Sequence, residues 1–180
     1  MKLAIGIPNT GIIKAQTAFA LIRTLKSFPH NYDILFKEGS ILHHNRETLV
    51  KVAIELKCTH LLFLDSDMYF EKDAILRLIK RKKDIIGANY YRRTLPLIDT
   101  VIAPKKKGLT TCDSIGTGFM LINLNVFKKL SEPWFFWETN SNGDMVMSED
   151  FWFCRKARKA GYKIWCDLTI PIRHIGDYYY

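Results

Sequence analysis

The most informative run of this sequence is Thr59-His60-Leu61-Leu62-Phe63-Leu64-Asp65-Ser66-Asp67-Met68. Its first part, residues 59–64, is apolar on both faces, which is typical of a strand in the interior of a parallel sheet. Two carboxylates follow this strand directly. Because ligands of open α/β sheets bind beyond the carboxyl ends of the strands, we expect Asp65 and Asp67 to face a ligand.

The segments around this strand alternate between strand and helix patterns. Strands are predicted at 3–7, 32–36, 59–64 and 84–87, and helices at 13–28, 42–56 and 74–79. The second half is less regular, with strands expected at 98–103, 119–124 and 163–167 and a helix at 148–160. Right-handed crossovers then predict an α/β fold, with a mostly parallel central sheet and helices on both faces.

Length and composition exclude several classes of protein. A chain of 180 residues favours one compact domain, and 48% hydrophobic residues are too many for a disordered chain. No apolar run reaches the roughly 18–20 residues that span a bilayer. The four cysteines are widely spaced, which favours reduced thiols over a disulfide framework or a zinc site. We therefore expect a cytoplasmic protein.

The chain is basic, with a formal net charge of +9. Basic residues gather at 80–83, at 105–107 and at 155–159. Such runs form solvated faces, or they attract an anion such as a diphosphate, an anionic membrane surface or a nucleic acid. Charge alone does not choose among these partners.

The pair Asp65 and Asp67 has the chemistry of a metal site. Two carboxylates suit Mg²⁺ or Mn²⁺, whose remaining positions go to water and substrate phosphates. An ion that bridges a diphosphate stabilises charge on the leaving group. The triplet alone also arises by chance, or as a turn that caps a helix, so the metal assignment depends mainly on its position after a buried strand.

Two further segments carry candidate groups. Glu149 and Asp150 follow Ser148 at the start of a predicted helix, where acids complement the helix dipole. A carboxylate held there could also take a proton from an attacking hydroxyl. His174 follows the last predicted strand, where a histidine is either structural or a third metal ligand.

The sequence resembles the GT-A glycosyltransferases of family 2, especially short bacterial and phage-type members. The resemblance covers nearly the whole chain. It rests on the ordered set of segments 59–68, 84–91, 116–122, 126–127, 133–135, 148–154, 160–162 and 174–176. It implies a single GT-A domain over residues 1–180, with a nucleotide-binding half at 1–95 and an acceptor-binding half at 96–180.

The resemblance also implies roles for individual residues. Asp150 is the expected base of an inverting reaction, with Glu149 as its neighbour. Asp67 and His174 are the expected ligands of Mn²⁺ or Mg²⁺, and Asp65 faces the metal or the ribose. The expected contacts of the nucleotide-sugar are Pro8, Asn9, Thr10, Glu38, Asn45, Arg46, Asp65, Ser66, Gly116, Thr117 and Gly118. Two features depart from the family: the order Asn45-Arg46, and Glu38 as the only acid after the second strand.

The expected reaction is metal-dependent transfer of a sugar from a nucleoside diphosphate, with UDP favoured over GDP, to a hydroxyl of a glycan, a lipid-linked or a protein acceptor. Peripheral contact with an anionic membrane is compatible with the charge, and no nucleic-acid partner is expected. Three alternatives remain open: a retaining transferase with the same metal site, a nucleotidyltransferase, and a non-catalytic module that binds a nucleotide-sugar or a nucleic acid.

Overall fold

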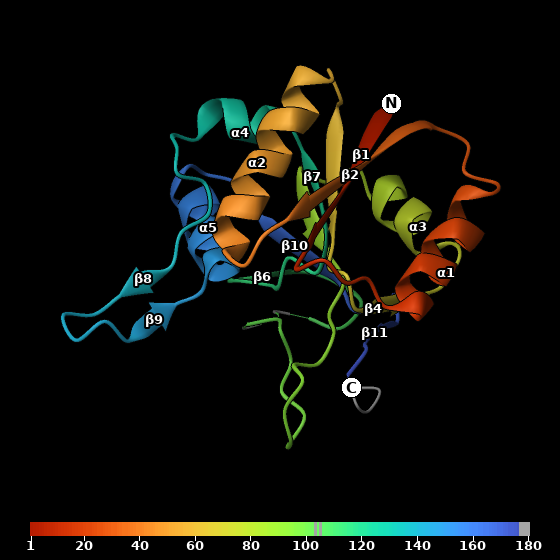
Figure 1. Ribbon diagram of the computed structural model, residues 1–180. Coiled ribbons are helices and arrows are strands. Elements are labelled where there is room, and N and C mark those ends of the chain that lie inside the picture. Colours follow the sequence, from red (N-terminus) through yellow and green to blue (C-terminus); the bar gives the residue numbers. More distant parts are fainter. Residues whose placement is uncertain (103, 105, 177–180) are drawn as a thin grey trace.

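A computed structural model describes residues 1–102, 104 and 106–176 of the chain. Its centre is a seven-stranded sheet in the order β2-β1-β3-β7-β5-β10-β6 (Figure 1). The strands are β1 (Lys2–Asn9), β2 (Asn31–Glu38), β3 (His60–Leu64), β5 (Ile85–Gly87), β6 (Leu109–Cys112), β7 (Phe119–Asn123) and β10 (Ile164–Asp167). Strands β7 and β6 pair antiparallel with their neighbours, and the other five run in one direction. The prediction of a mostly parallel sheet is therefore confirmed.

Helices cover both faces of this sheet. They are α1 (Ala15–Leu25), α2 (Leu42–Glu55), α3 (Ala74–Lys80), α4 (Asn125–Lys129) and α5 (Glu149–Lys159). Side chains of α1 and α3 pack on one face, with Leu3 and Ile5 of β1, whereas α2, α4 and α5 pack on the other face. Each buried face removes apolar surface from water, which is the main force that holds such layers together.

The central run of the sequence behaves as predicted. Residues 61–64 of β3 are all fully buried, with β1 on one side and β7 on the other. The four cysteines lie buried as free thiols, as the spacing indicates. Burial raises the pKa of the Cys112 thiol to about 12, so this thiol stays protonated at neutral pH.

The predicted strand at 98–103 is wrong. In its described part this segment makes only isolated bridges, from Asp99 to Tyr91 and from Ile102 to Ser114; residue 103 lies outside the described residues. Pro96 and Pro104 flank the segment, and a proline lacks the N–H that a ladder needs. The edge position next to β10 is taken instead by β6, which the sequence pattern did not reveal.

Two small sheets were also missed. Strand β4 (Met68–Phe70) pairs with β11 (Ile172–His174), and β8 (Glu138–Thr139) pairs with β9 (Met145–Met147). The first of these sheets matters for the site, because it places His174 opposite Met68, one residue after Asp67. The second forms a hairpin that projects from the body of the molecule just before α5 (Figure 1).

Candidate functional site

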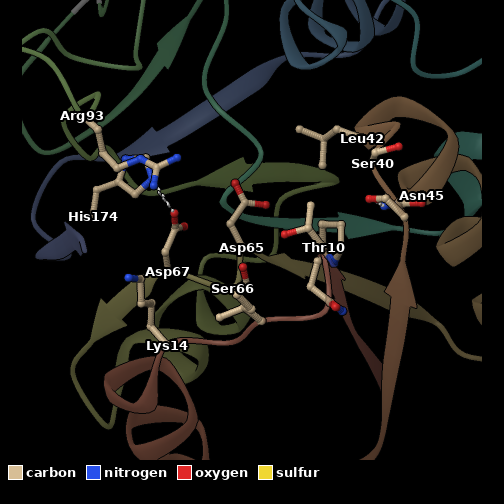
Figure 2. A pocket seen from close by; sticks show the side chains of 14 residues that line it. Thr10, Lys14, Ser40, Leu42, Asn45, Asp65, Ser66, Asp67, Arg93 and His174 are labelled. Atoms are coloured by element: carbon tan, nitrogen blue, oxygen red, sulfur yellow. Dashed lines mark hydrogen bonds and ion pairs between the residues drawn. The ribbon is translucent and has the colours of Figure 1, made fainter. Parts of the chain in front are cut away.

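A pocket of about 450 Å³ lies at the carboxyl ends of β1, β2 and β3, where the sequence predicts a ligand edge. We call it the sheet-edge pocket. Its volume falls in the range of small-molecule sites. Its lining residues are Pro8, Asn9, Thr10, Ile12, Lys14, Gly39, Ser40, Leu42, Asn45, Asp65, Ser66, Asp67, Arg93 and His174 (Figure 2).

Backbone hydrogen bonds hold the three strand ends together. Gly39 N–H donates to the carbonyl of Asn9 at 2.9 Å, and Lys14 N–H donates to the carbonyl of Ser66 at 2.8 Å. The turn after β1 is closed by Gly11 N–H, which donates to Asn9 Oδ1 at 2.9 Å. The pocket wall is therefore built from main-chain contacts and does not depend on flexible side chains alone.

Asp67 faces two cationic or basic side chains in this pocket (Figure 2). Its Oδ2 atom lies 3.3 Å from His174 Nε2 and 3.2 Å from Arg93 Nη1. Burial alone would raise the pKa of Asp67, but the hydrogen bond and charge of His174, together with Arg93, hold the pKa below its ordinary value. Asp67 is thus a carboxylate that stays charged.

The orientation of His174 follows from its second nitrogen. Nδ1 lies 3.1 Å from the carbonyl of Tyr91, which can only accept a hydrogen bond, so Nδ1 carries a proton. With a proton on Nε2 as well, the ring is a cation that donates to Asp67 Oδ2; without that proton, Nε2 points a lone pair at Asp67 Oδ2. Two electron-rich atoms at that separation repel each other unless a proton or a metal cation lies between them. The pair therefore has the chemistry of a cation site.

Asp65 has a different environment. Its Oδ1 atom accepts a hydrogen bond from Arg46 Nη2 at 3.0 Å, and the Arg46 side chain is only 2% exposed. The Arg46 Nε atom also lies 3.3 Å from Oε1 of Glu149, which comes from the distant helix α5. The second oxygen of Glu149 accepts a hydrogen bond from Trp137 Nε1 at 2.7 Å. One buried guanidinium therefore joins α2, the end of β3 and the start of α5.

The charges of this network affect one another. Desolvation would lower the pKa of Arg46, but Asp65 and Glu149 reverse this and raise the pKa above its ordinary value. Burial raises the pKa of Asp65, although Arg46 opposes that shift. A buried charge is costly unless it is paired, so each member of the network depends on the others.

A second pocket, of about 410 Å³, lies beside the first. We call it the helix-start pocket, because it lies at the beginning of α5. Its lining residues are Tyr90, Arg92, Thr100, Met145, Val146, Met147, Ser148, Asp150, Phe151 and His174. His174 lines both pockets, so the two cavities meet at this ring.

Asp150 is the carboxylate of the helix-start pocket. Its Oδ1 atom accepts hydrogen bonds from the Ser148 hydroxyl and, at 2.8 Å, from Phe151 N–H. Burial and the nearby charge of Glu149 raise the pKa of Asp150 above its ordinary value. A carboxylate that holds a proton more tightly than usual is a better proton acceptor, which is what a general base requires.

The structure brings most of the predicted nucleotide contacts to one cavity. Pro8, Asn9, Thr10, Asn45 and Ser66 all line the sheet-edge pocket. Glu38 and Arg46 do not line it: Glu38 lies beside Gly11 in the turn after β1, and Arg46 lies buried behind Asp65.

The segment Gly116-Thr117-Gly118 also lies behind the pockets rather than in their walls. All three residues are buried. A Cβ atom on Gly118 would come within 2.6 Å of the Tyr90 hydroxyl and 2.9 Å of Asp65 Oδ2. Gly118 N–H donates to that hydroxyl at 2.9 Å, and its carbonyl accepts from Asp65 N–H at 2.9 Å. Gly118 therefore gives Tyr90 and Asp65 the space to approach the backbone.

Several site residues were missed by sequence reasoning. Lys14 and Arg93 line the sheet-edge pocket, and Tyr90 and Arg92 line the helix-start pocket. One signal was present: the pair Arg92-Arg93 follows shortly after β5, at the edge where the other strand ends carry polar residues. Arg93 belongs to a long irregular loop, so no periodic pattern marks its direction.

The three predicted metal ligands do not form one set. Across residues 1–102, 104 and 106–176, no three His, Cys, Asp or Glu side chains come close enough together to hold one ion. Asp67 and His174 meet, whereas Asp65 is engaged by Arg46. The protein itself thus offers two ligands at this position.

Comparisons with known proteins place the fold. No family model matches the sequence, and no curated protein matches it. Among solved structures, A197 from STIV aligns with a TM-score of 0.74 at 20% identity, over 98% of this chain and 87% of that chain. S. aureus TarS 1-349 aligns with a TM-score of 0.56 at 14% identity, over 93% of this chain and 60% of that chain.

A further structure, UDP-glucose pyrophosphorylase complexed with UDP-glucose, aligns with a TM-score of 0.58 at 9% identity, over 96% of this chain and 92% of that chain. At these identities the likeness shows the fold alone. The fold is the Rossmann-like α/β arrangement shared by GT-A and nucleotidyltransferase structures. Within the described residues, no helix is both long and apolar enough to cross a membrane.

Proposed function

We propose that this chain is a glycosyltransferase that moves a sugar from a nucleoside diphosphate to a hydroxyl acceptor with inversion. The observation that carries the proposal is the meeting of two pockets at His174, with the charged Asp67 in one and the high-pKa Asp150 in the other. Two carboxylates with pKa values shifted apart, in adjoining cavities, suit two different tasks in one reaction.

The sheet-edge pocket suits the donor. Lys14 and Arg93 bring positive charge to the same cavity as Asp67 and His174 (Figure 2). A diphosphate is the anion that such a set would bind, and its leaving-group charge is stabilised by donors already in place. The walls near Asn9, Thr10 and Asn45 remain for the nucleoside of the donor. The favoured donor is a UDP-sugar, and a GDP-sugar is the alternative.

The helix-start pocket suits the acceptor. We assign Asp150 as the base: it takes the proton of the acceptor hydroxyl while that oxygen forms a bond to the anomeric carbon. The bond from the anomeric carbon to the diphosphate oxygen breaks on the opposite side, so the nucleoside diphosphate leaves and the configuration inverts. Glu149 does not face this cavity; it holds the start of α5 through Arg46 and Trp137.

Asp67 and His174 fit a divalent ion. A carboxylate and an imidazole with a free Nε2 are suitable ligands for Mn²⁺ or Mg²⁺, and such ions take their remaining ligands from water and substrate phosphates. When bound, the ion supplies a Lewis acid that neutralises charge on the diphosphate. Asp65 belongs to this proposal as a contact to the ribose or to the water around the ion.

A nucleotidyltransferase is the second candidate, favoured by the likeness in fold to UDP-glucose pyrophosphorylase. The two reactions cleave different bonds. Glycosyl transfer releases a nucleoside diphosphate, whereas the pyrophosphorylase direction consumes pyrophosphate and releases a nucleoside triphosphate. A retaining transferase would release the same diphosphate but give the opposite anomer.

The testing experiment is a thermal-shift panel of nucleoside diphosphates and their sugars, each with and without Mn²⁺. Selective stabilisation that requires the metal supports a donor site, since a ligand that binds only the folded state raises the melting temperature. Equal stabilisation by inorganic diphosphate alone, with no preference for a base or a sugar, would reduce the site to an anion-binding pocket. The acceptor classes remain a glycan, a lipid-linked or a protein hydroxyl.

A further inference from the structure

The two edges of the central sheet differ in length and in cover. Strand β6 forms one edge with four residues, and β2 forms the other with eight. Among the described residues, β2 pairs with β1 alone, along its whole length. A long uncovered edge strand is a template for pairing with another chain, and proteins usually shorten or cover such edges.

One face of β2 is apolar and exposed. Tyr32, Ile34 and Phe36 are 40%, 37% and 58% exposed, and they alternate along the strand. The register pairs them with Leu3, Ile5 and Ile7 of β1, which belong to the buried core under α1 and α3. The other face differs, because Leu35 there packs against the core that α2 helps to form. The apolar face that α1 and α3 cover on β1 thus extends to β2, where its side chains are exposed.

The free hydrogen-bonding groups of β2 are those of its even-numbered residues. Gly39 N–H donates to the Asn9 carbonyl, so odd-numbered residues of this strand turn their N–H and C=O groups toward β1. Groups of neighbouring residues point to opposite sides of a strand. The N–H and C=O groups of Tyr32, Ile34 and Phe36 therefore point outward, away from β1.

We propose that β2 pairs antiparallel with β2 of a second copy of this chain, about a two-fold axis at Leu35. In this register Ile34 lies opposite Phe36 of the partner copy, twice, and these even-numbered residues form the hydrogen-bonded pairs. On the other face Asp33 lies opposite Lys37 of the partner copy, again twice. Registers centred on Ile34 or on Phe36 would also use the outward N–H and C=O groups of the even-numbered residues. In neither of them does Asp33 lie opposite Lys37 of the partner copy.

Charge complementarity is what selects the second copy as the occupant of this edge. In a symmetric pair the same surface must complement itself, and Asp33 with Lys37 does so about Leu35. The contacts that the structure describes for Asp33, with Lys2 at 2.8 Å and with the Cys58 thiol at 3.7 Å, both use Oδ2. The Oδ1 atom is left for the partner's lysine.

The paired arrangement leaves both sites open. The carboxyl end of β2 leads into Gly39 and Ser40, which line the sheet-edge pocket. Antiparallel strands point their carboxyl ends in opposite directions, so the two sheet-edge pockets lie at opposite ends of the joined sheet. Dimer formation is therefore independent of the proposed reaction, and a variant at the edge should keep metal-dependent donor binding.

The test is sedimentation velocity of the full chain over a wide range of concentration, with four variants. Phe36→Lys and Lys37→Asp should each weaken self-association by about tenfold or more. The double variant Asp33→Lys/Lys37→Asp should restore it. Ile22→Lys is the matched control, because Ile22 is 68% exposed but lies on α1. It should associate like the original chain, and circular dichroism should show that every variant is folded.

Amide hydrogen exchange of the original chain at low and high concentration gives an independent readout. The N–H groups of Ile34 and Phe36 should become protected only at high concentration, whereas those of Asp33 and Leu35 are protected at both. A chain that stays monomeric at every concentration overturns the proposal. This holds also if β2 is found to bind anionic vesicles instead. A dimer of the original chain in which the Ile34 and Phe36 amides stay unprotected also overturns it, and so does a Phe36→Lys variant that dimerises as strongly as the original chain.

Discussion

Asp67 and Asp150 are both carboxylates in pockets that meet at His174, yet their environments shift their pKa values in opposite directions. His174 and Arg93 hold the pKa of Asp67 below its ordinary value, whereas burial and Glu149 raise that of Asp150. Residue type alone therefore does not assign a role to a carboxylate. A cation partner keeps one group charged, and an apolar setting makes the other a stronger base.

The largest expected effect comes from removing Asp150, the proposed base. Replacing Asp150 with Asn should lower kcat by about 10²–10⁴-fold, because the acceptor hydroxyl loses its proton acceptor. Donor binding, measured by thermal shift with Mn²⁺, should be unchanged. Asp144→Asn, on the exposed β8–β9 hairpin, is the control and should keep full activity. Transfer at the original rate by the Asp150→Asn variant would remove Asp150 from the reaction.

The same variant should be at least as stable as the original chain at neutral pH. The raised pKa of Asp150 means that the folded state favours the protonated, neutral carboxyl, so its contribution to stability is lost as pH rises through that pKa. Asparagine is neutral at every pH and removes this loss. The activity of the original chain should fall as pH falls through the same pKa, at a pH above the ordinary value of 3.8 for aspartate.

The next largest effect should come from replacing Arg46, whose guanidinium joins Asp65 after β3 to Glu149 at the start of α5. Arg46→Met should lower the free energy of unfolding by about 3–5 kcal/mol, because it leaves Asp65 and Glu149 with an uncompensated buried charge. Chemical denaturation measures this directly. Arg23→Met is a matched control, since its ion pair with Glu71 lies nearer the surface and contributes at most about 1 kcal/mol. Equal losses in both variants would contradict the coupling role of Arg46.

A smaller effect is expected from replacing Asp67. Asp67→Asn should weaken the Mn²⁺-dependent part of nucleotide binding by about 10–100-fold, with little change in binding without metal. Titration calorimetry with and without Mn²⁺ separates the two parts. If the Mn²⁺-dependent part of nucleotide binding persists unchanged, Asp67 is not a metal ligand, and its proposed difference in role from Asp150 is wrong.

The smallest effect concerns Arg93, which is half exposed and shares Asp67 Oδ2 with His174. A cation held between Asp67 Oδ2 and His174 Nε2 competes with this guanidinium for the same oxygen. Arg93→Ala should therefore tighten the binding of Mn²⁺ alone by up to about fivefold, the size of an exposed ion pair. Weaker Mn²⁺ binding in this variant would show that Arg93 supports the site instead of competing for it.

The part of the site that could be predicted is the part built on regular elements. Asp65 and Asp67 follow a buried strand, and Asp150 begins a helix with a clear pattern, so topology alone places them at one edge. Arg93 and Tyr90 could not be placed, because they lie in an irregular segment, which carries no period. Lys14 falls within the helix predicted at 13–28, but the structure begins α1 at Ala15 and leaves Lys14 just before it, in the pocket wall. The sequence also did not predict that β7 lies antiparallel between β3 and β5. The residue pattern of a buried strand does not depend on the direction in which the strand runs.

Arg46 shows a different kind of limit. Its position on α2 was predicted, and a contact with the nucleotide was the expected role. The structure places it behind Asp65, 103 residues away in sequence from its second partner Glu149. Contacts of such long range depend on the packing of three elements, which no local pattern encodes.

The configuration of the product tests the proposed inverting transfer most directly. The donor that gives the largest Mn²⁺-dependent thermal shift is incubated with the chain, and the anomeric protons are followed by nuclear magnetic resonance, with water as acceptor if no other is known. We predict release of a nucleoside diphosphate and a first-formed sugar of inverted configuration, both abolished by Asp150→Asn. A product of retained configuration, or a nucleoside triphosphate formed on addition of pyrophosphate, would contradict it.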